Sequence, residues 1–346
     1  MSKHCIGEDT ERAAALPAAP RASAGHAPPR RPSSVRRTAS IDATWPEDRI
    51  NAMAFDARAR DLLTHADGRG EVLAFDQVAA RIIDRAIEAI TCAPARPGLQ
   101  KLLGARGGNQ MRSILNEALP EERIAGTPLY LLIDDFAGAS LIGPGVWQHW
   151  PAADPEVNPV PFSDIRANAI AKMEGVCISF QRGSTAMLDV RGDLQNFADV
   201  VPLPDPADPL SWHPMPANQG KSLRRARRID VWREDGAIRV DAMFQDTAGT
   251  PSGVRRAIHE YGIDVLVDGA TMTIKRIGAT ARVLPYPECP SAVAKLQLLV
   301  GTPMRELRSA VLEHLPKTMG CTHLNDALRA LAEVPTMAAA LDRSHA

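Results

Sequence analysis

The chain has 346 residues, of which 45% are hydrophobic and 23% charged, a balance typical of globular proteins. At roughly 100–200 residues per domain, this length predicts two domains. The formal net charge of -1 gives no overall attraction to nucleic acid or to an anionic membrane, so neither is expected as a partner. The sequence offers no apolar run of the ~20 residues that a membrane helix needs, and its start lacks the apolar core of a signal peptide.

Five cysteines are scattered widely along the chain. An odd number without regular spacing argues against a disulfide framework and favours a reducing compartment. We therefore expect a cytoplasmic protein, in which each cysteine is a small buried hydrophobe, a metal ligand or a reactive thiol. They are Cys5, Cys92, Cys177, Cys289 and Cys321.

The first part of the chain predicts a tail and then an α+β module. Residues 1–34 are rich in Ala, Pro, Arg and Ser and are expected to be disordered. Residues 35–136 form the first module, with two extended segments, a turn near 64–70 and then helices. The apolar stretch 72–91 and the amphipathic segment 111–120 are the predicted helical parts.

Residues 137–220 contain many prolines and glycines and predict a connector with little regular structure. One helix is expected around 167–174 and one strand around 176–180. Residues 221–336 form a second α+β module, with a β-hairpin that turns at 267–270, and residues 337–346 form a tail.

The second module repeats features of the first. Asp56 and Asp61 recur as Asp241 and Asp246 at a constant offset of 185, and segment 111–120 matches 307–316 at five of ten positions. With Ile41–Asp42, which recurs as Ile229–Asp230, these make three matches in the same order, and they predict two diverged tandem copies of a small antiparallel sheet with helices on one face. The alternative is coincidence between amphipathic segments.

Only the second copy carries a plausible metal-ligand set. Cys321 and His323 lie two apart at a predicted helix start, where the helix dipole would favour a thiolate. Cys289 supplies a second thiol, and His259 a further imidazole. Thiolate and imidazole together suit zinc or iron. The alternative is that both cysteines are core residues and His323 a helix-capping residue.

Two other residues are candidates for catalytic roles. Glu260 follows His259 and is a candidate general base, although alternation along a strand would point the two side chains to opposite faces. His213, held among prolines beside Trp212, either completes a pocket or fastens the connector to the surface.

The motifs also carry two resemblances. From about Arg36 to Val334 the chain resembles an uncharacterised bacterial family of unknown function, through RRTASID, DPLSWH, RRARRID, FQDT, IHEYGIDVLVD, PECP and GCTHLNDALRALA. The element order of residues 255–334 is similar to the iron–sulfur scaffold fold of the SufU and NifU type. That resemblance places Cys289 at the second cysteine of the scaffold, Cys321 at the third, and His259–Glu260 at the first. A cluster prefers cysteine throughout, so this departure favours a mononuclear zinc or iron ion.

We therefore expect a metal-dependent hydrolase or lyase that acts on a small organic, catabolic-type substrate. The alternative is a metal or iron–sulfur carrier without catalysis, which would expose its ligands on a docking surface, whereas an enzyme would cover them with the connector. The sequence leaves a homo-oligomer open.

Overall fold

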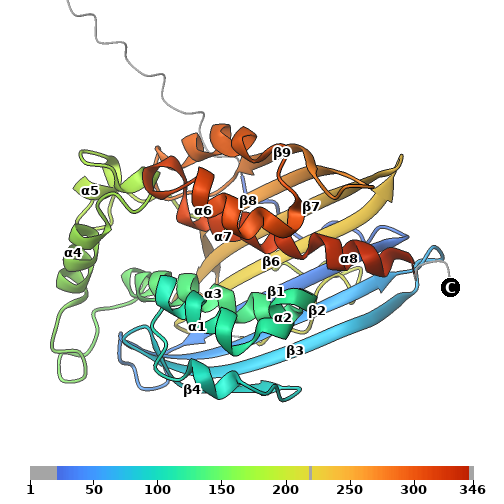
Figure 1. The fold of residues 1–346 in the computed structure, drawn as a ribbon. Coiled ribbons are helices and arrows are strands. Elements are labelled where there is room, and N and C mark those ends of the chain that lie inside the picture. Colours follow the sequence, from blue (N-terminus) through green and yellow to red (C-terminus); the bar gives the residue numbers. More distant parts are fainter. Residues whose placement is uncertain (1–21, 218–219, 343–346) are drawn as a thin grey trace, which may run out of the picture.

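A single antiparallel sheet of nine strands runs through the protein in the computed structural model, which describes residues 22–217 and 220–342 (Figure 1). The strand order is β4-β3-β2-β1-β6-β7-β8, and both β9 and the short β5 pair with β8. The two predicted modules therefore share one sheet. The strands are β1 (Ser34–Thr44), β2 (Ala52–Thr64), β3 (Gly70–Ile83), β4 (Ala86–Ala93), β5 (Ala198–Val200), β6 (Ser222–Glu234), β7 (Ala237–Gly249), β8 (Arg255–Asp268) and β9 (Ile274–Ala281).

The predicted helix over 72–91 is wrong, because this stretch forms β3 and β4. Its buried side chains recur at every second position, at Val78, Ala80 and Ile82, which is the strand period. The hairpin turn contains no glycine. Asp84 and Arg85 instead adopt positive φ angles of 48° and 67°, which suit a tight hairpin turn but leave a weak signal in the sequence.

The two halves of the sheet have the same internal pairing. Strands β2 and β7 have 13 residues each, and β3 and β8 have 14. In the first half the register shifts between Asp61 and Leu62, where Asp61 lies opposite Ala74. In the second half it shifts between Asp246 and Thr247, where Asp246 lies opposite His259. Both pairs of equivalent positions are separated by the offset of 185 that links the two aspartates in the sequence.

The halves join where β1 pairs antiparallel with β6. Two ion pairs cross this junction in reciprocal positions. Arg36 Nε donates to Asp230 Oδ1 over 2.6 Å, and Arg224 Nε donates to Asp42 Oδ1 over 2.8 Å. Because these arginines are buried or nearly so, the two ion pairs help the backbone hydrogen bonds to fix the register of the junction.

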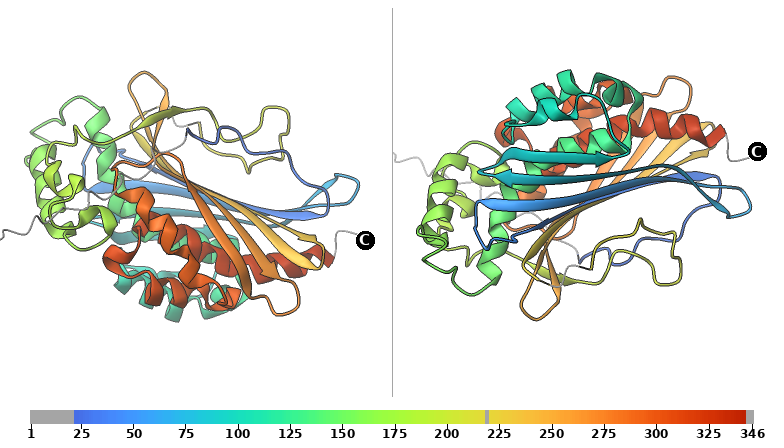
Figure 2. Two further views of the ribbon diagram at one scale, coloured as in Figure 1. Left: turned by 90° about the horizontal axis from the view of Figure 1, so that it is seen from above. Right: turned by 90° about the horizontal axis from the view of Figure 1, so that it is seen from below.

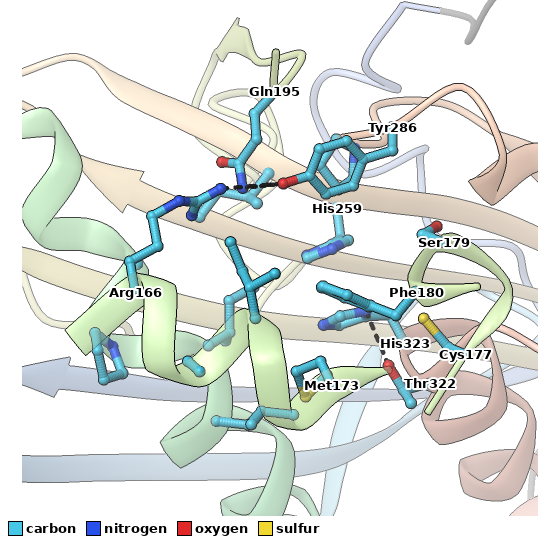
Figure 3. A pocket seen from close by; sticks show the side chains of 18 of the residues that line it. Arg166, Met173, Cys177, Ser179, Phe180, Gln195, His259, Tyr286, Thr322 and His323 are labelled. Atoms are coloured by element: carbon cyan, nitrogen blue, oxygen red, sulfur yellow. Dashed lines mark hydrogen bonds between the residues drawn. The ribbon is translucent and has the colours of Figure 1, made fainter. Parts of the chain in front are cut away.

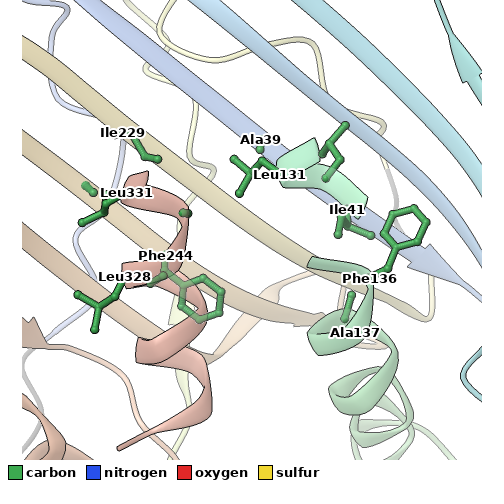
Figure 4. Close-up of a cluster of buried hydrophobic side chains, with 14 of the residues drawn as sticks. Ala39, Ile41, Leu131, Phe136, Ala137, Ile229, Phe244, Leu328 and Leu331 are labelled. Carbon is green, nitrogen blue, oxygen red and sulfur yellow. The ribbon is translucent and has the colours of Figure 1, made fainter. Parts of the chain in front are cut away.

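The helices cover one face of this sheet, with α1–α3 over the first half and α6–α8 over the second (Figures 1 and 2). Figure 4 shows α3 and α7 side by side above the central strands, where Phe136 and Leu328 point into the apolar layer. The helical elements are η1 (Leu99–Leu102), α1 (Asn109–Ala118), α2 (Pro120–Ala125), α3 (Pro128–Ile142), η2 (Gly143–His149), α4 (Phe162–Met173), η3 (Ile178–Phe180), α5 (Thr185–Leu188), η4 (Cys289–Leu299), η5 (Met304–Glu306), α6 (Leu307–His314), η6 (Lys317–Met319), α7 (Thr322–Ala330), η7 (Leu331–Glu333) and α8 (Val334–Ala340).

Within the described residues, one helical segment, Pro128–His149, is long and apolar enough to cross a membrane by length and composition. Its most apolar window is 78% buried inside the fold. It packs on β1, β2 and β3. We therefore assign it as the core helix of the first half.

The connector forms one end of the molecule and then returns along the sheet. Its expected helix is present as α4, but the expected strand over 176–180 is wrong, since residues 178–180 form the short helix η3. Figure 2 shows residues 22–33 and 201–217 on the face of the sheet opposite the helices. There Ala27 N donates to Leu203 O over 2.7 Å, and Trp212 is buried.

Both predicted tails are therefore shorter than expected. Residues 22–33 pack against the sheet, and α8 continues to Ala340 with Met337 and Ala338 buried. The remaining tail residues, 1–21 and 343–346, lie outside the described residues.

Candidate metal centre in an apolar cavity

A cavity of about 210 Å³ lies where the connector meets the second half of the sheet (Figure 3). The helices α3 and α4, the turn η3 and the start of α7 surround it. About half of its lining side chains are apolar, and its polar and cysteine lining residues are Gln148, Arg166, Cys177, Ser179, Gln195, His259, Tyr286, Cys289, Cys321, Thr322 and His323. Residues of the connector thus form part of the wall of this cavity.

Two histidines and an aspartate meet at the base of this cavity. Asp246, His259 and His323 each offer one atom that could bind a metal, and these three atoms lie within 4.8 Å of one another. Asp246 Oδ2 is 3.5 Å from His259 Nδ1 and 3.9 Å from His323 Nε2. The imidazole rings stack with their centroids 3.5 Å apart. In the described part of the chain this is the one such group of three potential ligands.

The local fold brings these side chains together in two ways. The bulge between Asp246 and Thr247 places His259 directly opposite Asp246, so that both side chains face the helices. His323 comes from the first turn of α7, where the Thr322 hydroxyl lies 3.4 Å from His323 Nδ1. In the first half Ala74 occupies the position opposite Asp61, so that half has no imidazole there.

The Asp246 carboxylate is fully buried and paired with Arg225, whose Nε and Nη2 donate to it over 2.9 and 3.0 Å. Burial opposes its ionisation, but the charge of Arg225 holds the pKa of Asp246 below its ordinary value. Burial lowers the pKa of His259, and it lowers the pKa of His323 further, so burial favours the neutral form of both rings. His259 Nδ1 is buried and makes no hydrogen bond of good geometry.

Three cysteines line the same cavity as free thiols. Burial raises the pKa of Cys321 and Cys289, and it raises the pKa of Cys177 to about 11. The expected thiolate at Cys321 is therefore wrong for the protein without a metal, because desolvation outweighs the dipole of α7. Cys289 Sγ lies 2.8 Å from Ser179 Oγ. The structure brings Cys289, Cys321, His259 and His323 to one cavity, and their role as ligands stays a prediction.

The two predicted catalytic residues lie on the other side of the sheet. Glu260 is fully buried and accepts hydrogen bonds from Gln245 Nε2 over 3.0 Å and from Ala24 N over 2.6 Å. It points away from His259, as alternation along the strand predicts. His213 contacts the hydroxyls of Thr38 and Ser40 over 2.9 and 2.8 Å. The structure does not bring Glu260 or His213 to the cavity, so neither can act there as a general base.

We expect the free energy of unfolding to depend on pH through His213. Burial and the surrounding arginines lower its pKa to about 3. In the unfolded chain the ring titrates near 6.5, so below that pH the unfolded state takes up a proton that the folded state refuses, and stability is lost. We expect His213 to contribute a loss of up to about 1.4 kcal/mol per pH unit between pH 6 and 4. Urea unfolding at a series of pH values measures it.

His213→Gln is the control, since an amide keeps hydrogen-bonding groups but does not titrate. This variant is expected to be less stable than the wild type at pH 7.5 and to lose less on acidification. Equal slopes of unfolding free energy against pH in the two proteins would contradict the assignment.

Residues 223–337, about a third of the chain, match a family described as "Protein of unknown function (DUF2889)". No curated protein and no solved structure matches the chain. The match supports the resemblance to an uncharacterised family over the second half, from β6 to α8. The resemblance to iron–sulfur scaffolds and to a family reaching back to Arg36 stays a prediction.

Sequence reasoning missed Asp246, Cys177 and Arg166 as site residues. Asp246 was visible only as a repeat of Asp61, and nothing in the sequence marks the bulge that sets it against His259. Cys177 and Arg166 lie in a connector whose path over the sheet no local pattern predicts.

Proposed function

We propose that the protein is a metal-dependent enzyme that acts on a small organic molecule in its apolar cavity. The observation that carries this proposal is the group formed by Asp246, His259 and His323 at the cavity base. Two imidazoles and a carboxylate are ligands that suit zinc or iron. The bound ion would act as a Lewis acid toward a substrate oxygen or a water molecule, as hydrolysis and lyase chemistry both require.

Features of the protein support such a site. Burial lowers the pKa of His259 and His323 and so favours the neutral rings that ligation requires, and His259 Nδ1 is a buried nitrogen without a hydrogen-bond partner that an ion would satisfy. The stacked rings must tilt apart on binding, because imidazole lone pairs lie in the ring planes. The hydroxyl of Thr322 can fix the orientation of His323 from behind.

Charge balance gives the cysteines a part in the proposal. Because Arg225 already neutralises Asp246, a divalent ion would bring uncompensated positive charge into a buried place. A coordinating thiol loses its proton and would supply the missing negative charge. Cys321, two residues from His323, and Cys289 line the same cavity and remain in the proposed ligand sphere. In the described residues no cysteine belongs to the group within 4.8 Å, so a thiol would have to rotate to join it.

The alternative is a metal or iron–sulfur carrier. A carrier must present its ligands to a partner. Here the side chain of Asp246 is fully buried, and those of His259 and His323 are 8% and 16% exposed. The cover that the connector forms over them therefore favours the enzyme. A cytoplasmic location is also part of the proposal, and the four free cysteines of the described residues are consistent with it.

We further propose that the two halves are diverged copies of one unit. The equal lengths of β2 and β7 and of β3 and β8, the matching register, the same bulge and the reciprocal ion pairs of the junction all support this. On this proposal the first copy keeps Asp61 and its arginine but has lost, or never had, the imidazoles.

Elemental analysis of the purified full chain tests the metal site. We expect about one equivalent of zinc or iron in the wild type and less than a tenth of that in His259→Ala and in His323→Ala, because each removes a ligand. Cobalt substitution in the wild type should give visible ligand-field bands that both variants lack.

His314→Ala is the matched control, since His314 is an exposed histidine at the end of α6. Glu260→Gln is a second control on the far face of the sheet. Both should keep the metal. A wild type that binds none, or alanine variants that keep a full equivalent, would refute the proposed function.

A further inference from the structure

The cavity has a polar end of its own, apart from the histidine pair. Arg166 of α4, Gln195 of the connector and Tyr286 meet there (Figure 3). Arg166 Nη2 donates to the Tyr286 hydroxyl over 3.1 Å and to the backbone oxygen of Asp189 over 3.1 Å. The neighbouring side chains thus fix the guanidinium at the cavity wall.

Arg166 differs from Arg225, the buried arginine that pairs with Asp246, in how well a carboxylate neutralises its charge. Arg225 makes two short bonds to one carboxylate. Arg166 meets the carboxylate of Asp189 through a single contact of 3.4 Å. The Asp189 carboxylate also accepts hydrogen bonds within its own loop: Oδ1 accepts from the backbone N of Gly192 over 2.9 Å and from that of Leu194 over 3.2 Å. The guanidinium charge is therefore only loosely neutralised.

Gln195 shows where an acceptor would sit on Arg166. Its amide is best oriented with Oε1 toward the guanidinium, where it accepts from Nη2 over 3.1 Å and from Nη1 over 3.2 Å. An acceptor that receives hydrogen bonds from both Nη1 and Nη2 lies where the carboxylate lies in a bidentate arginine–carboxylate pair. The amide oxygen is neutral and can turn aside, so a ligand carboxylate can replace it with a gain in charge pairing.

The rest of the cavity limits the body of the ligand. Its walls are formed by apolar side chains such as Met173, Phe180 and Ile170. Its volume of about 210 Å³ lies below the ~300–1,000 Å³ of sites for drug-sized molecules. We infer that the protein binds a hydrophobic monocarboxylic acid of about one ring in size, its carboxylate on Arg166 and its body between the apolar walls. That this acid is the substrate rests on the proposed function; that it binds does not.

Calorimetric titration of the full chain with benzoate tests the inference, with benzamide as the neutral probe of the same shape. We expect benzoate to bind the wild type at least tenfold more tightly than benzamide does. In Arg166→Gln, benzoate affinity should fall about 10- to 100-fold, the loss of a charged hydrogen-bonding partner, while benzamide affinity stays within threefold. Unchanged benzamide binding shows that the variant is folded around an intact cavity.

Arg182→Gln is the matched control, because Arg182 is an exposed arginine of the connector that does not line the cavity. It should bind benzoate as the wild type does. The inference is overturned if benzamide binds as well as benzoate, if Arg166→Gln keeps full benzoate affinity, or if neither benzoate nor cyclohexanecarboxylate binds.

The metal analysis keeps the two proposals apart. Benzoate binding in His323→Ala, together with a wild type that holds no metal, would support the inference and refute the metal-dependent function. A wild type that holds metal but binds neither benzoate nor cyclohexanecarboxylate would support the metal-dependent function and overturn the inference.

Discussion

Asp246→Asn and Asp61→Asn are expected to cost similar stability, yet only the first should abolish metal binding. Each aspartate forms a two-bond pair with a buried arginine, Asp61 with Arg37 over 2.6 Å and Asp246 with Arg225 over 2.9 and 3.0 Å. Removing one partner of a buried pair leaves an uncompensated charge and costs about 3–5 kcal/mol. Only Asp246 also faces two imidazoles.

The comparison separates a ligand from a structural carboxylate at equivalent places in one sheet. Urea unfolding measures the stability of both variants, and elemental analysis measures their metal content. Asp246→Glu keeps the charge, so it should retain more stability than Asp246→Asn while still weakening the metal. Metal content that falls equally in the two asparagine variants would show that loss of folding, and not loss of a ligand, removes the ion.

The buried pair of Arg227 and Asp135 is expected to contribute as much to stability as the pairs of Asp61 and Asp246. We also expect that two apolar side chains can replace it. Arg227 of β6 donates two hydrogen bonds to Asp135 of α3, and both residues are buried. Burial raises the pKa of Asp135 although Arg227 opposes this, so desolvation of the carboxylate outweighs the attraction of its partner. We expect Asp135→Leu to lower the free energy of unfolding by about 3–5 kcal/mol, because it strands the Arg227 charge.

The double variant Asp135→Leu with Arg227→Met should recover most of that loss, since an apolar pair of similar volume replaces both charges. Unfolding by urea with constant slope would place all three proteins on one scale. A single variant within about 1 kcal/mol of the wild type, or a double variant no more stable than the single one, would contradict this account.

The sequence predicted the composition of the fold better than its assembly. The two extended segments that form β1 and β2, the hairpin turn at Asp268 and the start of α7 after Cys321 were all visible, because local patterns determine them. The union of both halves in one sheet could not be predicted, because β1 and β6 pair although they begin 188 residues apart in the sequence.

The site was predicted in the same uneven way. His259 and His323 were chosen for their residue type, and the structure places them in contact. Glu260 could not be placed, because its role depended on which face of β8 carries the cavity, and a one-residue bulge sets that face. His213 was misplaced for a related reason, since the connector crosses to the far side of the sheet before reaching it.

The β1–β6 junction has one further property. Shifting β1 by 188 positions superposes its Arg36 and Asp42 on Arg224 and Asp230 of β6. Strand β6 is therefore complementary to itself: two antiparallel copies in the same register would set Arg224 of each opposite Asp230 of the other. The matched family begins at residue 223, within this strand. In a protein that carried one such unit, the same seam would lie on a twofold axis between two chains, and the sheet would close as a symmetric dimer.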